Sequence, residues 1–202
     1  MIGIIDYGSG NLKSVYNAFK YIGESVLVCQ NAKDINSSDK IVLPGVGSIK
    51  DAMGELEKKD MIPAIKENIA DGKIFLGICL GLQMLFKRSE ESSGCDCLGL
   101  VDGVVKLFSK KEEMKVPQIG WNTVKQVKDN CPIFEGIEDE SYFYFVHSYY
   151  CENNETELDS GITEYGLKYT SALWKDNIYA LQFHPERSQD NGIKILRNFC
   201  KL

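Results

Sequence analysis

The sequence predicts an α/β protein: an open, mostly parallel central sheet flanked by helices, with a smaller antiparallel β excursion in the second half. In the first half, short apolar runs alternate with segments of helical period, and such alternation is typical of parallel pairing. In the second half, β-rich runs follow one another with turn residues between them, which indicates antiparallel hairpins. No linker or internal repeat interrupts the 202 residues, so we expect a single domain over residues 1–202.

The elements of the first half follow from apolar spacing. Ile2–Asp6 is an apolar run that ends at the turn Gly8-Ser9-Gly10. The next segment, Asn11–Ile22, has apolar residues at 12, 15, 16, 19 and 22, a helical period, and Asn11 can cap it. Further strands are expected at Val26–Val28, Lys40–Leu43 and Ile74–Ile78, and further helices at Ser48–Leu56, Met61–Ile69 and Leu80–Phe86.

The second half begins with a polar, glycine-dotted stretch over residues 89–102, which we expect to form a loop or lid. Turn residues at Asp129-Asn130, Asn153-Asn154 and Asp176-Asn177 then separate the β-rich runs. Those runs are Val104–Phe108, Thr123–Val127, Tyr142–Cys151, Leu167–Trp174 and Ile178–Phe183, and Ile193–Phe199 closes the chain as a helix.

Charge and composition exclude several classes of protein. Lys and Arg number 23 and Asp and Glu number 29, so the formal net charge of −6 argues against nucleic acid or an anionic membrane as the main partner. The longest apolar runs are far shorter than the roughly 20 residues that span a bilayer. The N-terminus lacks the basic region of a signal peptide. Seven scattered cysteines then indicate reduced thiols and a cytoplasmic location.

No cofactor or metal is expected. Cys95 and Cys97 are the only close cysteine pair, and no second pair of Cys or His lies near them. The glycines after the first strand begin like a dinucleotide fingerprint, but its third glycine would fall on Lys13. Pro44-Gly45-Val46-Gly47 is not followed by the Lys and Ser or Thr of a phosphate loop. Its backbone N–H groups are suited instead to a developing oxyanion, although an ordinary turn has the same sequence.

The sharpest local feature is Gly77-Ile78-Cys79-Leu80-Gly81, which follows a strand and opens a helix. Glycines flank a nucleophile in this way when its backbone makes a tight, strained turn. The turn exposes the sulfur at the carboxyl end of the sheet, and the helix start favours a thiolate. A buried structural cysteine in a glycine-rich turn remains the alternative.

A thiolate nucleophile needs a base, and the chain has two histidines. His184 lies just after an apolar run and before Pro185, so it is held rigidly at a strand end. Glu186 can orient the imidazole of His184, so a nucleophile, a base and an orienting acid are all available, as in a catalytic triad. His147 lies in an aromatic run and is open to three interpretations: a second base, a substrate contact or a packed residue.

Taken together, these residues resemble the class I (triad) glutamine amidotransferases, over nearly the whole chain. The match consists of Pro44-Gly45-Val46-Gly47, of Gly77-Ile78-Cys79-Leu80-Gly81-Leu82-Gln83 and of Phe183-His184-Pro185-Glu186. The resemblance implies a flavodoxin-like fold and a glutaminase in which Cys79 attacks the side-chain amide of glutamine, His184 shuttles the proton and Glu186 orients His184. It assigns the oxyanion hole to Gly45, Val46, Gly47 and Leu80, and glutamine binding to Gln83, Glu91, His147, Ser148 and Tyr149.

Within that family, three further motifs narrow the resemblance to glutaminase subunits that serve a (β/α)-barrel partner. They are Tyr7-Gly8-Ser9-Gly10-Asn11-Leu12, Gly120-Trp121-Asn122 and Tyr144-Phe145-Val146-His147-Ser148-Tyr149. The implied partner is the cyclase subunit of imidazole glycerol phosphate synthase, in a heterodimer, with ammonia passing from one subunit to the other. The implied interface residues are Asn11, Trp121, Asn122, Tyr144 and Arg187.

Two departures and three alternatives qualify the resemblance. Arg187 stands where the family commonly has Lys, so an interface ion pair would be rebuilt rather than copied. Gln118 stands where the family often has His. One alternative is a triad glutaminase that feeds another acceptor enzyme, such as one modifying an amino sugar. A second is a cysteine hydrolase or peptidase on the same turn, and a third is a scaffold subunit with a dead site.

Overall fold

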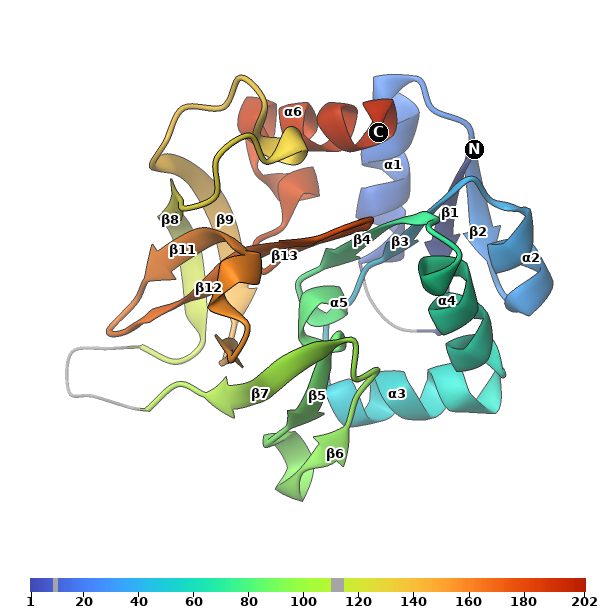
Figure 1. Cartoon of the computed structure of the whole chain (residues 1–202), viewed down its shortest axis with the longest axis horizontal. Helices are drawn as coiled ribbons and strands as arrows, with labels where there is room; N and C mark the ends of the chain where they lie inside the picture. The colour runs from blue at the N-terminus through green and yellow to red at the C-terminus, as the bar shows by residue number, and fades with distance from the viewer. Residues whose placement is uncertain (9–10, 110–114) are drawn as a thin grey trace.

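The computed structural model describes residues 1–8, 11–109 and 115–202, and within them thirteen strands form one sheet (Figure 1). Ser9 and Gly10, which belong to the expected first turn, lie outside the described residues. The parallel part of the sheet has the order β2-β1-β3-β4-β13, and every neighbouring pair in it is parallel. These strands are β2 (Val26–Cys29), β1 (Ile2–Ile5), β3 (Lys40–Leu43), β4 (Ile74–Ile78) and β13 (Ile178–Leu181). The predicted α/β class and its parallel core are confirmed.

Helices cover both faces of the parallel strands (Figure 1). One face is covered by α1 (Leu12–Ile22) and α6 (Gln189–Lys201), which touch through Phe19 and Phe199 with ring centroids 6.2 Å apart. The other face is covered by α2 (Ala32–Ser37), α3 (Ile49–Lys58) and α4 (Met61–Ala70). No helix in the described ranges is both long and apolar enough to cross a membrane.

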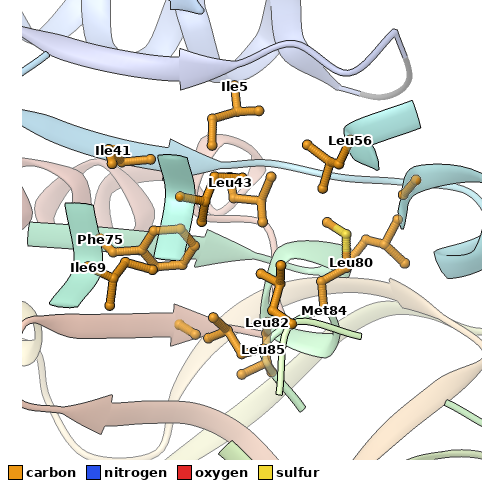
Figure 2. Close-up of a cluster of buried hydrophobic side chains, with 14 of the residues drawn as sticks. Ile5, Ile41, Leu43, Leu56, Ile69, Phe75, Leu80, Leu82, Met84 and Leu85 are labelled. Atoms are coloured by element: carbon orange, nitrogen blue, oxygen red, sulfur yellow. The ribbon is translucent and has the colours of Figure 1, made fainter. Parts of the chain in front are cut away.

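The apolar core is divided by the sheet because successive side chains of a strand point to opposite faces. In β3, Val42 packs toward α1 and α6, whereas Ile41 and Leu43 pack toward α3 and α4. Figure 2 shows the apolar cluster on the side of α3 and α4, where Leu43 and Phe75 lie among side chains of the neighbouring helices. The interior parallel strands β1, β3, β4 and β13 are therefore largely buried on both faces, as their mostly apolar sequences require, whereas the edge strand β2 is half-buried.

The antiparallel part of the sheet is larger than the sequence indicated. It includes the predicted hairpin between β12 and β13, which turns at Asp176 with a φ of 51°. From β13 the sheet continues through β12, β10, β7, β5 and β6, while β11, β8 and β9 branch from β12. Within this part, β5 and β7 are the exception, because they pair in parallel. These strands are β5 (Phe86–Ser89), β6 (Cys95–Asp96), β7 (Val101–Leu107), β8 (Gln118–Gln126), β9 (Ser141–His147), β10 (Tyr149–Asn153), β11 (Asp159–Glu164) and β12 (Lys168–Lys175).

Several predicted boundaries are wrong. The helix expected over Leu80–Phe86 is the single turn α5 (Leu80–Gln83), because Phe86 starts β5 and pairs with Val101 of β7. The stretch 89–102, expected as a loop or lid, contains β6 and the start of β7. The run Tyr142–Cys151 is two strands that separate at Ser148, since β9 pairs with β8 whereas β10 pairs with β7 and β12.

Other elements were not predicted, or were predicted with too few residues. The strand β11 and the short helix α2 were not predicted, and α6 starts four residues before the expected Ile193. Four short 3-10 helices also lie in the described connections: η1 (Glu91–Ser93), η2 (Pro132–Phe134), η3 (Thr156–Leu158) and η4 (Pro185–Arg187). Of these features, β11 depends on pairing with β8 and β12, which local periodicity does not report.

Candidate active site

Three neighbouring parallel strands deliver the candidate site at their carboxyl ends. Residues 44–47 follow β3, Cys79 follows β4, and residues 182–184 follow β13. Leu43 pairs with Gly77 and Leu181 pairs with Ile78, so the three strands end at almost the same level. Open α/β sheets place their ligands at this edge.

The turn at Cys79 has the strained geometry that its flanking glycines predicted. Cys79 has φ 53° and ψ −101°, outside the backbone regions that side chains favour. A Cβ on Gly77 would lie 2.8 Å from the carbonyl oxygen of Gly81, and a Cβ on Gly81 would lie 1.9 Å from that of Leu43. The N–H of Cys79 donates to the carbonyl of Leu181 over 2.7 Å. Close backbone contacts on both sides therefore fix the position of the sulfur. Because α5 is a single turn, its field at the sulfur is weaker than the predicted longer helix would supply.

His184 and Glu186 form a buried pair beside that sulfur. His184 Nδ1 lies 2.7 Å from Glu186 Oε1, and both side chains are buried. The Nε2 atom of His184 is buried without a hydrogen-bonding nitrogen or oxygen among the described residues. Burial alone would lower the pKa of His184, but the negative charges of Cys79 and Glu186 outweigh it and raise that pKa to about 10. A proton that reaches His184 is therefore retained near neutral pH.

Asn11 contributes to this pair in a way that the sequence did not indicate. It occupies the N-terminal boundary of α1, but its side chain makes no capping hydrogen bond, so the predicted capping role is wrong. Its Nδ2 donates instead to Glu186 Oε1, the same oxygen that faces His184. The start of α1 is thus tied directly to the carboxylate.

A cavity of about 290 Å³ opens in front of Cys79. All five residues that the resemblance assigned to glutamine binding line it, together with Val46, Gly47 and Leu80 of the expected oxyanion hole. The wall residues are Val46, Gly47, Cys79, Leu80, Gln83, Glu91, Pro117, Val146, His147, Ser148 and Tyr149. His184 and Glu186 are not part of this wall. The structure therefore brings the residues expected to bind glutamine together around one cavity, and it leaves the His184–Glu186 pair outside that cavity.

One of the expected oxyanion donors, the N–H of Leu80, is engaged with the protein itself. The N–H of Leu80 donates to the carbonyl of Gly45 over 3.3 Å. Gly45 is wedged in place, since a Cβ there would lie 2.4 Å from Tyr7 Oη and 2.7 Å from Leu80 Cβ. Gly47 has a φ of 98°, a conformation open to glycine. Rotation of the peptide that carries the Gly45 carbonyl would free the Leu80 donor.

His147 is held neutral. Its Nδ1 lies 2.8 Å from the carbonyl of Tyr149, which only accepts, so Nδ1 carries the hydrogen. Its Nε2 lies 3.3 Å from Tyr169 Oη. Burial lowers the pKa of His147 to about 4. Of the three interpretations left open by the sequence, packing in the cavity wall fits this environment, whereas a group with so low a pKa is a weak base at neutral pH.

A chain of side-chain amides connects the cavity to the sulfur, and sequence reasoning missed its last member, Gln182. Gln83 Nε2 donates to the carbonyl of Tyr149 over 2.9 Å and to Gln182 Oε1 over 3.1 Å. Gln182 Nε2 in turn donates to Cys79 Sγ over 3.6 Å. The signal was present, because Gln182 stands two positions before His184, and residues two apart in extended chain point to the same side.

Glu91 is fixed by the neighbouring helix. Its Oε2 accepts the N–H of Ile49, the first residue of α3, over 2.6 Å. A carboxylate at a helix N-terminus is stabilised by the unpaired N–H groups there. Glu91 thus reaches the cavity as a positioned carboxylate, although it was predicted from a stretch expected to be a loop.

The expected interface residues occupy three different settings. Trp121 is 45% exposed and contacts the half-buried Tyr144 edge-on, with ring centroids 6.1 Å apart. Arg187 is exposed. Asn122 is engaged within the chain, since its Nδ2 donates to the Glu164 carbonyl over 2.9 Å and its Oδ1 accepts from Thr123 over 2.8 Å. Within the ranges that the structure describes, no three His, Cys, Asp or Glu side chains converge as metal ligands.

The fold and the strained cysteine beside a His–Glu pair define a class of thiol-dependent enzymes built on an open α/β sheet. A family model described as glutamine amidotransferase class-I matches residues 3–202. The chain therefore belongs to the class I glutamine amidotransferase family.

Its relatives are similar to it along their whole length. The chain is 48% identical over 204 residues to the imidazole glycerol phosphate synthase subunit HisH of Sulfurimonas denitrificans, covering 100% of this chain and 98% of the relative. It is 47% identical over 202 residues to the protein of the same name from Methanocaldococcus jannaschii, covering 100% of both chains. Among solved structures, a glutamine amidotransferase has a TM-score of 0.76 at 15% identity, covering 99% of this chain and 97% of that one, which shows the shared fold.

Proposed function

We propose that this chain is the glutaminase subunit of an imidazole glycerol phosphate synthase. It hydrolyses glutamine to glutamate and ammonia and passes the ammonia to a (β/α)-barrel cyclase subunit for histidine biosynthesis. The observation that carries the proposal is the strained Cys79 at the mouth of an amino-acid-sized cavity, with the His184–Glu186 pair behind it. The naming of relatives 45–48% identical along the whole chain supports the choice of synthase. Residues 1–202 act as one domain, in the cytoplasm, where the seven free thiols stay reduced.

The first half of the reaction forms a thioester. Cys79 transfers its proton to His184 and attacks the side-chain carbonyl carbon of glutamine, which gives a tetrahedral oxyanion. When this intermediate collapses, the carbon–nitrogen bond breaks, and the leaving nitrogen takes the proton from His184 and departs as ammonia. The raised pKa of His184 suits the first of these proton transfers, because the Cys79 thiolate and Glu186 stabilise the imidazolium that forms.

The second half hydrolyses the thioester. A water molecule gives a proton to His184 and attacks the same carbon, and the electron pair of the breaking carbon–sulfur bond returns to Cys79. Glu186 holds the imidazole through Nδ1 in both halves, and Asn11 holds Glu186. This arrangement keeps Nε2 directed toward the reacting atoms.

The cavity wall is chemically matched to a free amino acid. Both hydrogen bonds donated by Gln83 Nε2 go to protein acceptors, so Oε1 is the Gln83 atom left for a ligand. An amide oxygen together with the Glu91 carboxylate suits the α-ammonium group of glutamine. A pocket of about 290 Å³ suits one residue better than an extended peptide, which disfavours the peptidase alternative.

The state of the oxyanion loop implies that activity depends on a partner. With the Gly45 carbonyl on the Leu80 N–H, a glutamine oxyanion would meet an acceptor where it needs a donor. We infer that binding of the cyclase and its nucleotide favours a rotated peptide in which this donor is free. The isolated chain is then expected to hydrolyse glutamine slowly.

The outer surface of the β8–β9 ribbon supports a docking site for the cyclase. Ile119, Trp121 and Tyr142 are 62%, 45% and 61% exposed, and the register places Trp121 opposite Tyr144 and Ile119 opposite Val146. Exposed apolar side chains that gather on one face are typical of interfaces. Val146 also lines the cavity, so this surface adjoins the place where ammonia is released.

The test is glutamate release from glutamine by the chain alone, by the chain with the cyclase subunit from the same source, and by the pair with its nucleotide substrate. Strong stimulation by partner and nucleotide, lost in Cys79→Ala, is the expected result. Activity that ignores this partner would contradict the assignment to histidine biosynthesis and favour another acceptor enzyme. No activity in any mixture, despite complex formation and an intact fold, would favour the dead-site alternative.

A further inference from the structure

The amide of Gln182 is buried against the sulfur of Cys79. Gln182 has no exposed surface, and its Nε2 lies 3.6 Å from Cys79 Sγ, a donor–acceptor distance suited to an N–H···S hydrogen bond. Its backbone N–H is satisfied separately, by the carbonyl of Ser171 over 2.9 Å. Nothing in the thiol and histidine chemistry described above uses this side chain, although a buried amide requires partners.

The orientation of this amide follows from a fixed backbone atom. The carbonyl of Tyr149 can only accept, so the Gln83 group facing it over 2.9 Å must be Nε2. The same Nε2 then faces Gln182 over 3.1 Å, so the Gln182 atom that meets it must be the acceptor Oε1. Gln182 Nε2 is consequently left facing the sulfur. A flipped Gln182 amide would set two donors against each other and direct an oxygen at the thiolate.

We propose that Gln182 is a further catalytic residue that donates its amide N–H to Cys79 Sγ and stabilises the sulfur whenever it carries negative charge. The inference rests on the proposed role of Cys79 as nucleophile. Gln83, one position along the amide chain, sets the direction of the Gln182 dipole, and the Tyr149 carbonyl anchors both. The amides polarise one another in the same direction, which strengthens the terminal donor.

The donor acts at two points of the reaction. Before attack, the Cys79 proton has moved to His184, and the sulfur holds a negative charge in a buried site. In the second half, the carbon–sulfur bond breaks and its electron pair returns to the sulfur. Between these points the thioester sulfur is neutral and gains little from a donor, so Gln182 favours the charged states over the intermediate.

The other groups near the sulfur do not replace this donor. His184 supplies charge and takes the proton. The thiol of Cys151 and the phenol of Tyr169 also influence the site, but burial raises the pKa of each well above its ordinary value, so both are neutral. Glu186 acts through His184. Gln182 therefore provides a fixed neutral dipole whose direction does not change with pH.

The test uses the isolated full-length chain and the pH dependence of Cys79 alkylation by iodoacetamide, followed by mass spectrometry of the peptide that contains Cys79. Gln182→Leu removes the donor, and Gln182→Glu keeps an acceptor for Gln83 while it replaces the donor with oxygen. Both variants are expected to move the midpoint of the alkylation profile up by about one pH unit or more, with roughly 10-fold lower kcat/KM in the assembled enzyme. Gln182→Glu serves also where Gln182→Leu fails to fold.

Asn198 provides the matched control. It is a buried carboxamide in α6 that donates to the carbonyls of Ile133 and Glu135 over 3.1 and 2.9 Å, away from the sulfur. Asn198→Leu should lower the melting temperature and leave the alkylation profile at its wild-type midpoint. Wild-type midpoints in both Gln182 variants would overturn the inference, as would an equal shift in Asn198→Leu. Because alkylation needs neither cyclase nor nucleotide, failure of the assignment to the synthase would leave this result unchanged.

Discussion

Replacement of Gly81 by alanine should damage the nucleophile turn through a backbone collision. The added Cβ would lie 1.9 Å from the carbonyl oxygen of Leu43, in the neighbouring strand β3. Neither side can relieve this contact by a side-chain rotation, because the opposing atom belongs to the backbone. The two elements must therefore separate by at least about 1.5 Å to reach an ordinary contact distance.

The loss of stability in Gly81→Ala can be estimated from the cost of overpacking a protein core. Overpacking of a dense core costs typically 1–3 kcal/mol, and a collision with backbone lies at the upper end, so we expect a loss of about 3 kcal/mol in the free energy of unfolding. Leu43 and Leu80 lie in one tightly packed cluster (Figure 2), so movement of α5 also displaces the Leu80 N–H and the sulfur beside it. In Gly81→Ala, both the stability of the chain and the rate of glutamine hydrolysis by the assembled enzyme should therefore fall.

Urea unfolding of the isolated chain measures the effect, and Gly54→Ala supplies the control. Gly54 lies within α3, and a Cβ there meets no atom within 4 Å. Since alanine is the better helix former, Gly54→Ala should raise the free energy of unfolding by about 0.5–1 kcal/mol. Opposite signs for the same substitution are the expected result. A Gly81→Ala protein as stable as Gly54→Ala would refute the packing argument for the turn.

Three further predictions concern the partner surface, acid stability and the triad. Trp121→Ala should weaken binding of the cyclase about 10-fold or more without changing the melting temperature, because the indole is exposed beside Tyr144. Titration calorimetry measures the affinity, and an unchanged affinity would place Trp121 outside the interface. The pKa of His147 is lowered to about 4, so the unfolded chain binds a proton that the folded chain refuses, and stability is full above about pH 6.5 and falls as the pH drops toward 4. His147→Asn should remove up to about 3 kcal/mol of this acid sensitivity in urea titrations at neutral and acid pH, and an unaltered pH profile would contradict the buried neutral assignment. Asn11→Leu should lower kcat about 10-fold and leave KM near the wild-type value, since it loosens Glu186 without touching the cavity; a rise in KM alone would count against the positioning role.

The parallel core could be predicted because its signals are local. Each of β1, β3 and β4 is a short, mostly apolar run, and the longer helices α1, α3 and α4 between them have a clear period. The nucleophile turn could be predicted for a related reason. Gly77 and Gly81 flank Cys79 because their neighbours leave no room for a side chain, and that requirement is written in the sequence as glycine.

The wrong predictions of secondary structure share a cause. Leu80–Phe86 has a helical pattern, yet Phe86 leaves the helix to pair with Val101 in β7. The aromatic run Tyr142–Cys151 reads as one strand, yet its two halves pair with different neighbours on either side of Ser148. In each case a pairing with distant residues overrides the local preference, and periodicity within a short window contains no information about it.

Residue patterns were enough to predict the fold class, the strained cysteine and the residue types of the triad and the cavity wall, because each depends on spacing within a few positions or on motifs that resemble a known family. Three contacts became evident in the folded chain alone: Gln182 faces the sulfur, Asn11 donates to Glu186, and the Gly45 carbonyl accepts the Leu80 N–H. These contacts join segments up to 175 positions apart, and their hydrogen-bond directions follow from which donor meets which acceptor. Such directions exist once the strands β3, β4 and β13 lie side by side, because pairing brings their ends to one edge of the sheet.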